Sequence, residues 1–231
     1  MVITILTLFP QVFREIFEFS IVGKALKKER VKIEIVNIRD YAQDKHRTVD
    51  DKPYGGGTGM LLRVDVLNRA IEASKIKISE GKLKFKEKII LLDPSGKIFN
   101  QAKARKYSHL DHLILVCGHY EGVDSRINNF VDENISIGQY ILTGGEIPAI
   151  VVTDSIVRLI PGVLSKREAT EIESFTKKDL LEAPQWTRPS SYKQLKVPKI
   201  LLSGDHGLVK QWRSDQALKR TRQNIKFSLS K

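Results

Sequence analysis

Short runs of β-branched and aliphatic residues recur along the first part of the chain, with segments of helical periodicity between them. This alternation restricts the fold most, because strands separated by crossover helices form an α/β domain with a largely parallel sheet. We expect strands at residues 2–9, 31–38, 89–92, 112–117 and 135–142, and helices at 10–29, 64–73, 100–109 and 125–131. Asn100 and Ser125 are the expected N-caps of the last two helices.

A longer apolar segment, EIPAIVVTDSIVRLIPGVL, starts at Glu146. Pro148 would lie in its first turn and Pro161 near its end, a pattern typical of one mostly buried helix. We expect this helix to close an α/β domain at residues 1–164. A polar, mobile linker at 165–174 and a helical, basic domain at 175–231, with its main helix at 207–223, would follow.

The formal net charge is +12, and it is concentrated toward the end of the chain. Residues 165–231 carry 15 Lys and Arg against 7 Asp and Glu, whereas residues 1–164 carry 24 against 20. Such a charge favours a polyanionic partner, of which nucleic acid is the leading candidate. The alternative is that the lysines only keep the surface soluble.

Three further features restrict the class of protein. The amino terminus lacks a basic leader with a cleavage site, and no run of 18 apolar residues occurs, so we expect a cytoplasmic protein that does not bind a membrane. The single cysteine, Cys117, lies in an apolar run and is expected to be a buried, unreactive thiol. The spacing of histidines and carboxylates matches no metal site, so we expect no structural metal.

Three expected strands are followed by turns that contain glycine: DPSG after residue 92, GHYEG after 117 and TGG after 142. Open α/β sheets bind ligands at the carboxyl ends of strands, where backbone N–H groups and missing side chains leave room. Each turn alone is also compatible with an ordinary tight turn. The first strand is not followed by a G-x-G-x-x-G, which argues against a dinucleotide site of the usual kind.

A fourth glycine cluster, PYGGGTGM at residues 53–60, lacks the G-K-[ST] ending of a phosphate loop, which argues against an NTPase. The cluster would instead form a flexible loop that closes over a base, or a plain hinge. The preceding stretch DKHRTVDD mixes both charges, and such residues bind phosphates and base edges. A solvated loop is the alternative.

Several longer phrases resemble one protein family. RDYAQDKHRTVDDKPYGGGTGM, LLDPSGKIFNQ, LILVCGHYEGVDSRI, SIGQYILTGGEIPAIVVTDSIVRLIPGVL, APQWTRP and VPKILLSGDHGLVKQWR are similar to segments of the bacterial tRNA (guanine-N1-)-methyltransferases. They occur in the family's order, without large insertions, over nearly the whole chain. Together they are far more specific than any single glycine pattern.

The resemblance implies a SPOUT-type α/β domain with a deep trefoil knot, a helical C-terminal domain and a homodimer. Without it, the rarity of threaded chains would favour an unknotted sheet. It also implies that S-adenosylmethionine donates a methyl group to N1 of the guanosine immediately 3′ of the anticodon in tRNA. The resemblance assigns donor binding to Pro94, Gly118, Tyr120, Glu121, Ser136, Ile137, Gly138, Gln139, Tyr140, Ile141, Leu142, Gly144, Gly145 and Pro148.

Guanine N1 holds a proton at neutral pH, so its methylation needs a general base, and the charge that develops on O6 needs a donor fixed nearby. The resemblance assigns these roles to Glu173 and Arg158. The family pattern has aspartate in place of Glu173, and Glu171 on the same linker is a competing base. Asp154 precedes Arg158 by four residues, which leaves an ordinary helix-surface pair as the alternative for Arg158.

We expect the RNA to bind charged residues in both parts of the chain. Residues 223–231 depart from the family's arginine-proline ending, so no function is transferred to them. Two other functions stay open: a knotted methyltransferase that acts at another RNA position, and an RNA-binding module without catalysis. The expected RNA contacts are His46, Arg47 and Asp50, and then Lys210, Arg213, Arg220 and Arg222.

Overall fold

The computed structural model describes residues 1–76, 85–165, 170, 172–177 and 180–229. The chain divides into two compact units, Met1–Ser165 and Lys166–Lys231. Within the described residues, no helix is both long enough and apolar enough to cross a membrane. The division into a domain at 1–164, a mobile linker at 165–174 and a domain at 175–231 stays a prediction.

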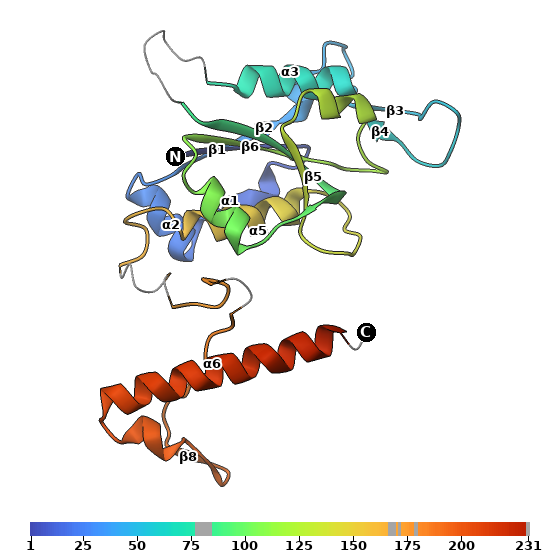
Figure 1. Ribbon diagram of the computed structural model, residues 1–231. Coiled ribbons are helices and arrows are strands. Elements are labelled where there is room, and N and C mark those ends of the chain that lie inside the picture. The colour runs from blue at the N-terminus through green and yellow to red at the C-terminus, as the bar shows by residue number, and fades with distance from the viewer. Residues whose placement is uncertain (77–84, 166–169, 171, 178–179, 230–231) are drawn as a thin grey trace. The chain divides into compact units, whose positions relative to one another are not determined.

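The first unit is built on a five-stranded sheet in the order β2-β1-β6-β5-β7, and every neighbouring pair of these strands is parallel (Figure 1). The prediction of an α/β fold with a mostly parallel sheet is therefore confirmed. The strands are β1 (Val2–Thr7), β2 (Lys32–Asn37), β5 (Glu87–Ile98), β6 (His112–Cys117) and β7 (Glu133–Ser136).

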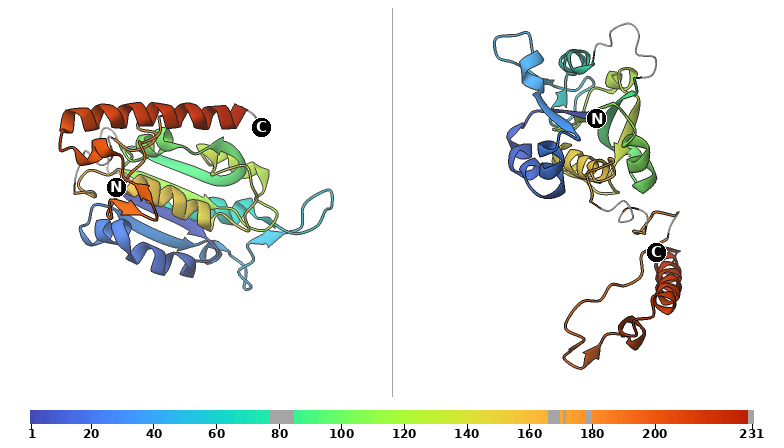
Figure 2. Two further views of the ribbon diagram at one scale, coloured as in Figure 1. Left: turned by 90° about the horizontal axis from the view of Figure 1, so that it is seen from below. Right: turned by 90° about the vertical axis from the view of Figure 1, so that its left-hand side faces the viewer.

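Helices cover both faces of the sheet, with α3 on one side and α1, α2 and α5 on the other (Figures 1 and 2). Successive strand residues point to opposite faces, so Ile5 and Leu6 enter separate hydrophobic cores. The helices are α1 (Gln11–Glu18), α2 (Ser20–Lys27), α3 (Val64–Ser74), α4 (Gln101–Tyr107) and α5 (Glu146–Val157), with 3-10 helices at Ile38–Tyr41 and Ser125–Asn129.

A small hairpin of β3 (Asp50–Asp51) and β4 (Leu61–Leu62) lies outside the main sheet. Its connecting loop carries the GGGTG cluster and projects away from the strands (Figure 1). The Leu62 amide donates to the carbonyl oxygen of Gly122 at 3.0 Å, which fixes the hairpin to the turn after β6.

The second unit contains the longest helix of the described chain, α6 (His206–Leu229), which extends beyond the expected range of 207–223 at both ends. Before it come a hairpin of β8 (Ser191–Tyr192) and β9 (Leu195–Lys196) and a 3-10 helix at Lys199–Leu202. This 3-10 helix packs against α6. Inside the unit, the Leu181 amide donates to the hydroxyl oxygen of Thr221 at 2.9 Å.

The single helix expected at residues 10–29 is wrong, because the chain breaks between α1 and α2. Phe19 is extended and Ser20 has a φ of 58°. In one straight helix, Phe17 and Val22 would point to nearly opposite sides at 3.6 residues per turn. The break lets both side chains enter the same core.

Other expected boundaries were also wrong. Residues 137–142 form a loop, since β7 ends at Ser136, and α5 ends at Val157 rather than continuing to Leu164. Asp124, not Ser125, caps the helix at Ser125–Asn129 by accepting from the Arg126 amide. The expected turn at residues 93–96 is an irregularity within β5, whose pairing with β7 shifts between Leu92 and Lys97.

Candidate functional site

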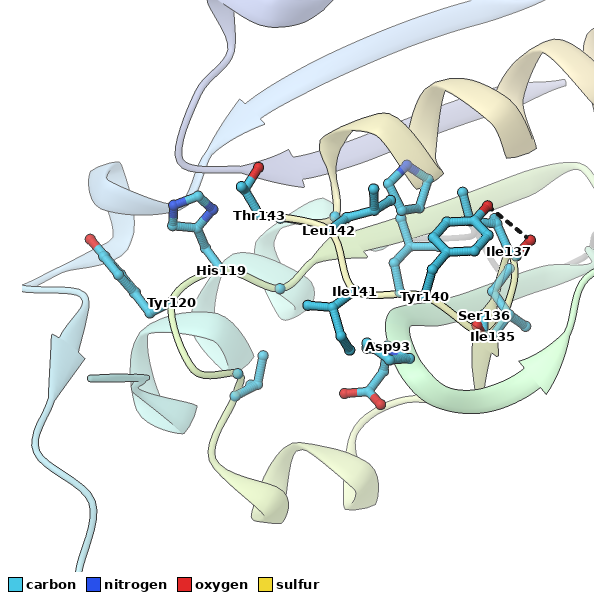
Figure 3. Close-up of a pocket in the computed structure, with 18 of the residues that line it drawn as sticks. Asp93, His119, Tyr120, Ile135, Ser136, Ile137, Tyr140, Ile141, Leu142 and Thr143 are labelled. Carbon is cyan, nitrogen blue, oxygen red and sulfur yellow. Dashed lines mark hydrogen bonds between the residues drawn. The ribbon is translucent and has the colours of Figure 1, made fainter. Parts of the chain in front are cut away.

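A cavity of about 400 Å³ lies at the carboxyl ends of β6 and β7 and beside the bulge in the middle of β5 (Figure 3). Three segments form its walls: the bulge after Leu92, the turn after Cys117 and the loop from Ser136 to Gly145. Ligand cavities of several hundred Å³ are common at this edge of parallel sheets. The lining residues are Leu92, Asp93, Pro94, Gly118, His119, Tyr120, Glu121, Gly122, Val123, Ile135, Ser136, Ile137, Gly138, Tyr140, Ile141, Leu142, Thr143, Gly144, Gly145 and Pro148.

This cavity gathers every residue predicted to hold the donor except Gln139, which is exposed and outside the lining. Their role in donor binding stays a prediction. His119 and Thr143 also line the cavity and were not predicted individually, although both lie inside the glycine-containing turns expected at strand ends. Their position in those turns was the available signal.

The loop after β7 starts with a local turn made by Ser136. The Ser136 hydroxyl donates to the carbonyl oxygen of Gly138 at 2.8 Å and lies 3.2 Å from the Gly138 amide, which ends the strand. Beyond the turn, Tyr140 is 54% exposed and Ile141 is 82% exposed, and both line the cavity. Figure 3 shows the Tyr140 hydroxyl turned back to the Ile137 carbonyl oxygen, 3.3 Å away. Exposed apolar groups beside a cavity indicate a ligand with an apolar part.

Gly145 joins this loop to the turn after β6 at close range. Its amide donates to the carbonyl oxygen of Gly118 at 2.8 Å. A Cβ atom on Gly145 would lie 2.6 Å from the Cα atom of Cys117, which is backbone and cannot swing away. Glycine is therefore required here for the two walls to meet.

We expect Gly145→Ala to destabilise the fold by about 1–3 kcal/mol, the usual effect of overpacking. For a chain of this size, that loss lowers Tm by roughly 2–10 °C. Gly118→Ala is the matched control, because its Cβ atom would meet its nearest neighbours at an ordinary 3.5 Å. Thermal unfolding of both variants measures the difference, and equal melting temperatures would contradict the role of Gly145.

A buried carboxylate, Glu146, lies behind the cavity wall and was missed by the sequence analysis. It accepts a hydrogen bond from the Thr7 hydroxyl at 2.8 Å, and its Oε2 atom lies 3.9 Å from Nδ1 of His119. Burial, with a smaller contribution from Glu146, raises the pKa of the Cys117 thiol well above its ordinary value. The prediction that Cys117 is buried is confirmed, and its raised pKa makes the thiol unreactive.

The GGGTG loop reaches the edge of the cavity at Glu121. The Glu121 amide donates to the carbonyl oxygen of Met60 at 3.1 Å. Gly59 has a φ of +82°, and a Cβ atom there would lie 2.3 Å from Cγ of Glu121. The loop that was predicted to close over a base is therefore adjacent to the cavity.

His46 and Arg47 lie on an exposed turn before β3, the strand that Asp50 begins. Asp44 shapes this turn by accepting from the amides of His46 and Thr48 and from the Thr48 hydroxyl. The hydrogen bond from the Thr48 hydroxyl contributes most to lowering the pKa of Asp44. Arg47 pairs with Asp40 at 3.2 Å, and their exposure leaves the guanidinium accessible to a phosphate.

Arg158 and Glu173, the predicted catalytic residues, belong to different units. Arg158 is half-buried at the carboxyl end of α5, and its amide donates to the Asp154 carbonyl oxygen at 3.3 Å. Glu173 is half-buried in a turn, where its carbonyl oxygen accepts from the Thr176 amide at 3.2 Å. Glu171, the competing base, lies outside the described residues.

The predicted RNA-binding residues of the second unit are all exposed on α6. At 3.6 residues per turn, three of them lie within about 80° around the helix axis, whereas Arg222 points elsewhere. Arg220 also donates to the Glu182 carbonyl oxygen at 3.3 Å. The three residues that share a face are Lys210, Arg213 and Arg220.

Among the residues that the structure describes, no group of three or more His, Cys, Asp or Glu side chains is arranged to hold a metal ion.

Comparison with known proteins places these features in one family. The family model described as tRNA (Guanine-1)-methyltransferase TrmD matches residues 1–230. A tRNA (guanine-N(1)-)-methyltransferase of Dictyoglomus turgidum is 48% identical over 219 residues, covering 95% of this chain and 86% of that protein. Enzymes of the same name from Listeria monocytogenes and Metamycoplasma arthritidis are 47% and 46% identical, over 96% and 100% of this chain and 89% and 96% of their own lengths. The chain therefore belongs to the tRNA (guanine-1)-methyltransferase family.

Proposed function

We propose that this protein transfers a methyl group from S-adenosylmethionine to N1 of the guanosine immediately 3′ of the anticodon in tRNA, in the cytoplasm. Membership of the family makes the chain a tRNA (guanine-N1-)-methyltransferase. The cavity at the β5 bulge and the carboxyl ends of β6 and β7 carries the proposal for this chain.

The residues around the cavity fit S-adenosylmethionine. The cavity volume suits a nucleoside joined to an amino acid. Ile137 and Leu142 offer apolar surface to an adenine ring. The lack of a side chain at Gly138 lets the Tyr140 ring pack directly against the loop, since a Cβ atom there would lie 2.2 Å from that ring. Backbone groups of the same loop are available to hydrogen bond with the edge of the base.

Glu173 and Arg158 would act on the guanine base. We assign to the Glu173 carboxylate the role of accepting the N1 proton, which frees the electron pair that forms the new N–C bond. The Arg158 guanidinium then stabilises the negative charge that develops on O6, for which its planar fork is suited. When bound, S-adenosylmethionine would supply an electrophilic methyl group on a sulfonium, whose S–CH3 bond breaks as the N–C bond forms and whose sulfur leaves as a neutral thioether.

The position of Arg158 supports a site shared between two chains. The cavity lies at the amino end of α5, where Pro148 lines it, whereas Arg158 lies at the other end. At 1.5 Å per residue, the ten positions that separate Pro148 from Arg158 span about 15 Å along the helix. An arginine side chain cannot cover that distance, so we propose that Arg158 serves the cavity of a second copy in a homodimer.

An exposed apolar stripe on α5 also supports the homodimer. Ile147 and Val151 are exposed although they are apolar, and helical spacing places Asp154 and Arg158 on the same side of α5. Neighbouring apolar side chains that are exposed on a helix mark a surface for a partner to cover. In a two-fold dimer, this self-complementary stripe would pack against its own copy.

The family resemblance also implies a trefoil knot. Two contacts of the loop after β7 support it. The Gly145 amide donates to the Gly118 carbonyl oxygen, and His119 forms a bridge with Gly144, so the loop returns against the turn after β6 before α5 begins.

We expect the affinity for tRNA to fall steeply with salt, because the basic residues of α6 bind phosphates and release counterions. Lys210→Ala should lower the slope of log affinity against log salt by about one unit relative to wild type. Filter binding of unmodified tRNA between low and moderate salt measures both. An affinity that does not change with salt would exclude phosphate binding by this unit.

The function is tested by incubating the protein with labelled S-adenosylmethionine and unmodified tRNA, and then mapping the modified base. The proposal predicts 1-methylguanosine next to the anticodon and nowhere else in the tRNA. A methyl group at another position would identify a methyltransferase with a different RNA site. Binding of tRNA without transfer would identify an RNA-binding protein without catalysis.

A further inference from the structure

The second unit contains a separate cavity that the methyl-transfer site does not use. Its volume is about 340 Å³, and Trp186, a residue that is 47% exposed, contributes to its lining. We call it the Trp186 pocket. Its lining residues are Pro184, Gln185, Trp186, Thr187, Arg188, Ser190, Val197, Leu201, Leu202 and Arg213.

The pocket lies between the chain segment before β8, the 3-10 helix Lys199–Leu202 and the first half of α6. In Figure 1 the 3-10 helix adjoins the amino-terminal end of α6, and the hairpin lies beyond the 3-10 helix. The Ser190 carbonyl oxygen accepts from the Val197 amide at 2.9 Å, which closes the hairpin beside the pocket. The pocket is therefore held by regular structure within one unit.

The charged residues of the Trp186 pocket favour an anionic ligand. Arg188 and Arg213 both line it, and the described lining contains no Asp or Glu. Within the described part of the chain, neither guanidinium group forms a hydrogen bond or an ion pair. Two accessible guanidinium groups beside an apolar wall suit a ligand that has both a phosphate and a flat apolar face.

An unstacked nucleotide has this combination. Nucleobases stack on exposed aromatic side chains, and arginines bind the adjoining phosphates. Gln185, Thr187 and Ser190 offer hydrogen-bonding groups for a base edge. An apolar peptide would leave both arginines without a partner, so the charge of the pocket argues against a protein segment as its occupant.

We propose that the Trp186 pocket binds one unpaired nucleotide of the tRNA, with its base stacked on Trp186 and its phosphate held by Arg188 and Arg213. This proposal rests on the proposed function, since it requires a tRNA substrate. It adds a second point of recognition, remote in the sequence from the loops that line the methyl-donor cavity.

The first test follows the tryptophan itself. The chain has two tryptophans, and Trp212→Phe leaves Trp186 as the single one. We expect unmodified tRNA to quench the emission of Trp186 in this full-length variant, and heparin at matched charge to leave it nearly unchanged. Equal quenching by heparin, or no quenching by tRNA, would overturn base stacking in the pocket.

The second test measures affinity and turnover. Trp186→Leu is expected to raise the Kd for tRNA by about 5- to 150-fold, the range for losing one base stack, while Trp186→Phe retains most of the affinity. The rise should appear in the KM for tRNA and leave kcat unchanged at saturating tRNA. Tyr192→Leu is the matched control, because Tyr192 is a similarly exposed aromatic residue of the same unit that does not line the pocket.

The outcomes separate this proposal from the proposed function. If the wild-type protein methylates tRNA and Trp186→Leu binds it with unchanged Kd, the pocket proposal fails and the function stands. If the wild-type protein neither binds nor methylates tRNA, both fail. If Trp186→Leu unfolds, the Kd of Arg188→Ala for tRNA is compared with the Kd of Trp186→Phe. The proposal requires Arg188→Ala to bind tRNA more weakly than Trp186→Phe does.

Discussion

Glu173→Gln is expected to lower the single-turnover rate of methyl transfer by about 100-fold or more, the scale at which a general base contributes. The amide keeps the size and hydrogen-bonding shape of the carboxylate but cannot take the N1 proton. Binding of S-adenosylmethionine should stay nearly unchanged, because Glu173 is not among the residues that line the cavity. Rapid-quench measurement with saturating enzyme gives the rate, and calorimetry gives the donor affinity.

Glu182→Gln is the matched control for this prediction. Glu182 is a carboxylate of the same unit and is held nearby, since its amide donates to the Ser174 hydroxyl oxygen at 2.9 Å. Its removal should leave the rate at the wild-type level. A wild-type rate in Glu173→Gln together with a large loss in Glu171→Gln would transfer the role of base to Glu171.

Glu173 differs from the family pattern in the length of its side chain. The family pattern has aspartate at this position, so the carboxylate here extends one methylene further from the backbone. The Glu173 turn is fixed by bonds from the Thr176 amide and hydroxyl to its carbonyl oxygen. If the turn holds the backbone at a set distance from the guanine, the shorter side chain of Glu173→Asp will reduce transfer. The reduction should be smaller than in Glu173→Gln, because aspartate retains the proton acceptor.

Periodicity in the sequence predicted the sheet because its signal is strong and local. Strand β6 is buried along its whole length, and its apolar run was predicted with the observed bounds. The end of β7 at Ser136 was predicted wrongly, because the local signal after it is misleading. Tyr140 to Leu142 are residues typical of strands, but they are exposed in a loop that lines the cavity, where a ligand would cover them.

The candidate site was predictable where it depends on glycine-containing turns at strand ends, and not where it depends on tertiary contacts. Nothing local in the sequence distinguishes Glu146 from an ordinary acidic residue in the first turn of a helix. Its burial results from packing against Thr7, which is 139 residues away in the chain. Likewise, the association of Gly59 with Glu121 depends on how the β3–β4 hairpin packs against the turn after β6.

Arg158→Ala is expected to lower the single-turnover rate of methyl transfer by about 100-fold, as Glu173→Gln does, because one preorganised donor to a developing oxyanion contributes on that scale. Asp154→Ala is the control that separates chemistry from helix stability. If Arg158 served only as the partner of Asp154 on the surface of α5, the two variants would behave alike and each would change stability by only a few tenths of a kcal/mol. Loss of transfer in Arg158→Ala alone supports its action on the base.

Complementation between inactive variants tests whether Arg158 of one chain acts at the cavity of the partner chain. Ile141→Arg places a positive charge in the cavity at a position that is already 82% exposed, so the variant should fold and dimerise but fail to bind the cationic donor. A heterodimer of Ile141→Arg with Arg158→Ala, isolated through two different affinity tags, has one intact cavity if Arg158 comes from the partner chain. We then expect about half of the wild-type rate per dimer, as two-fold symmetry requires. If Arg158 served the cavity of its own chain, both sites of the heterodimer would be defective and the heterodimer would stay inactive. That result would contradict the separation of about 15 Å inferred along α5 at about 1.5 Å per residue.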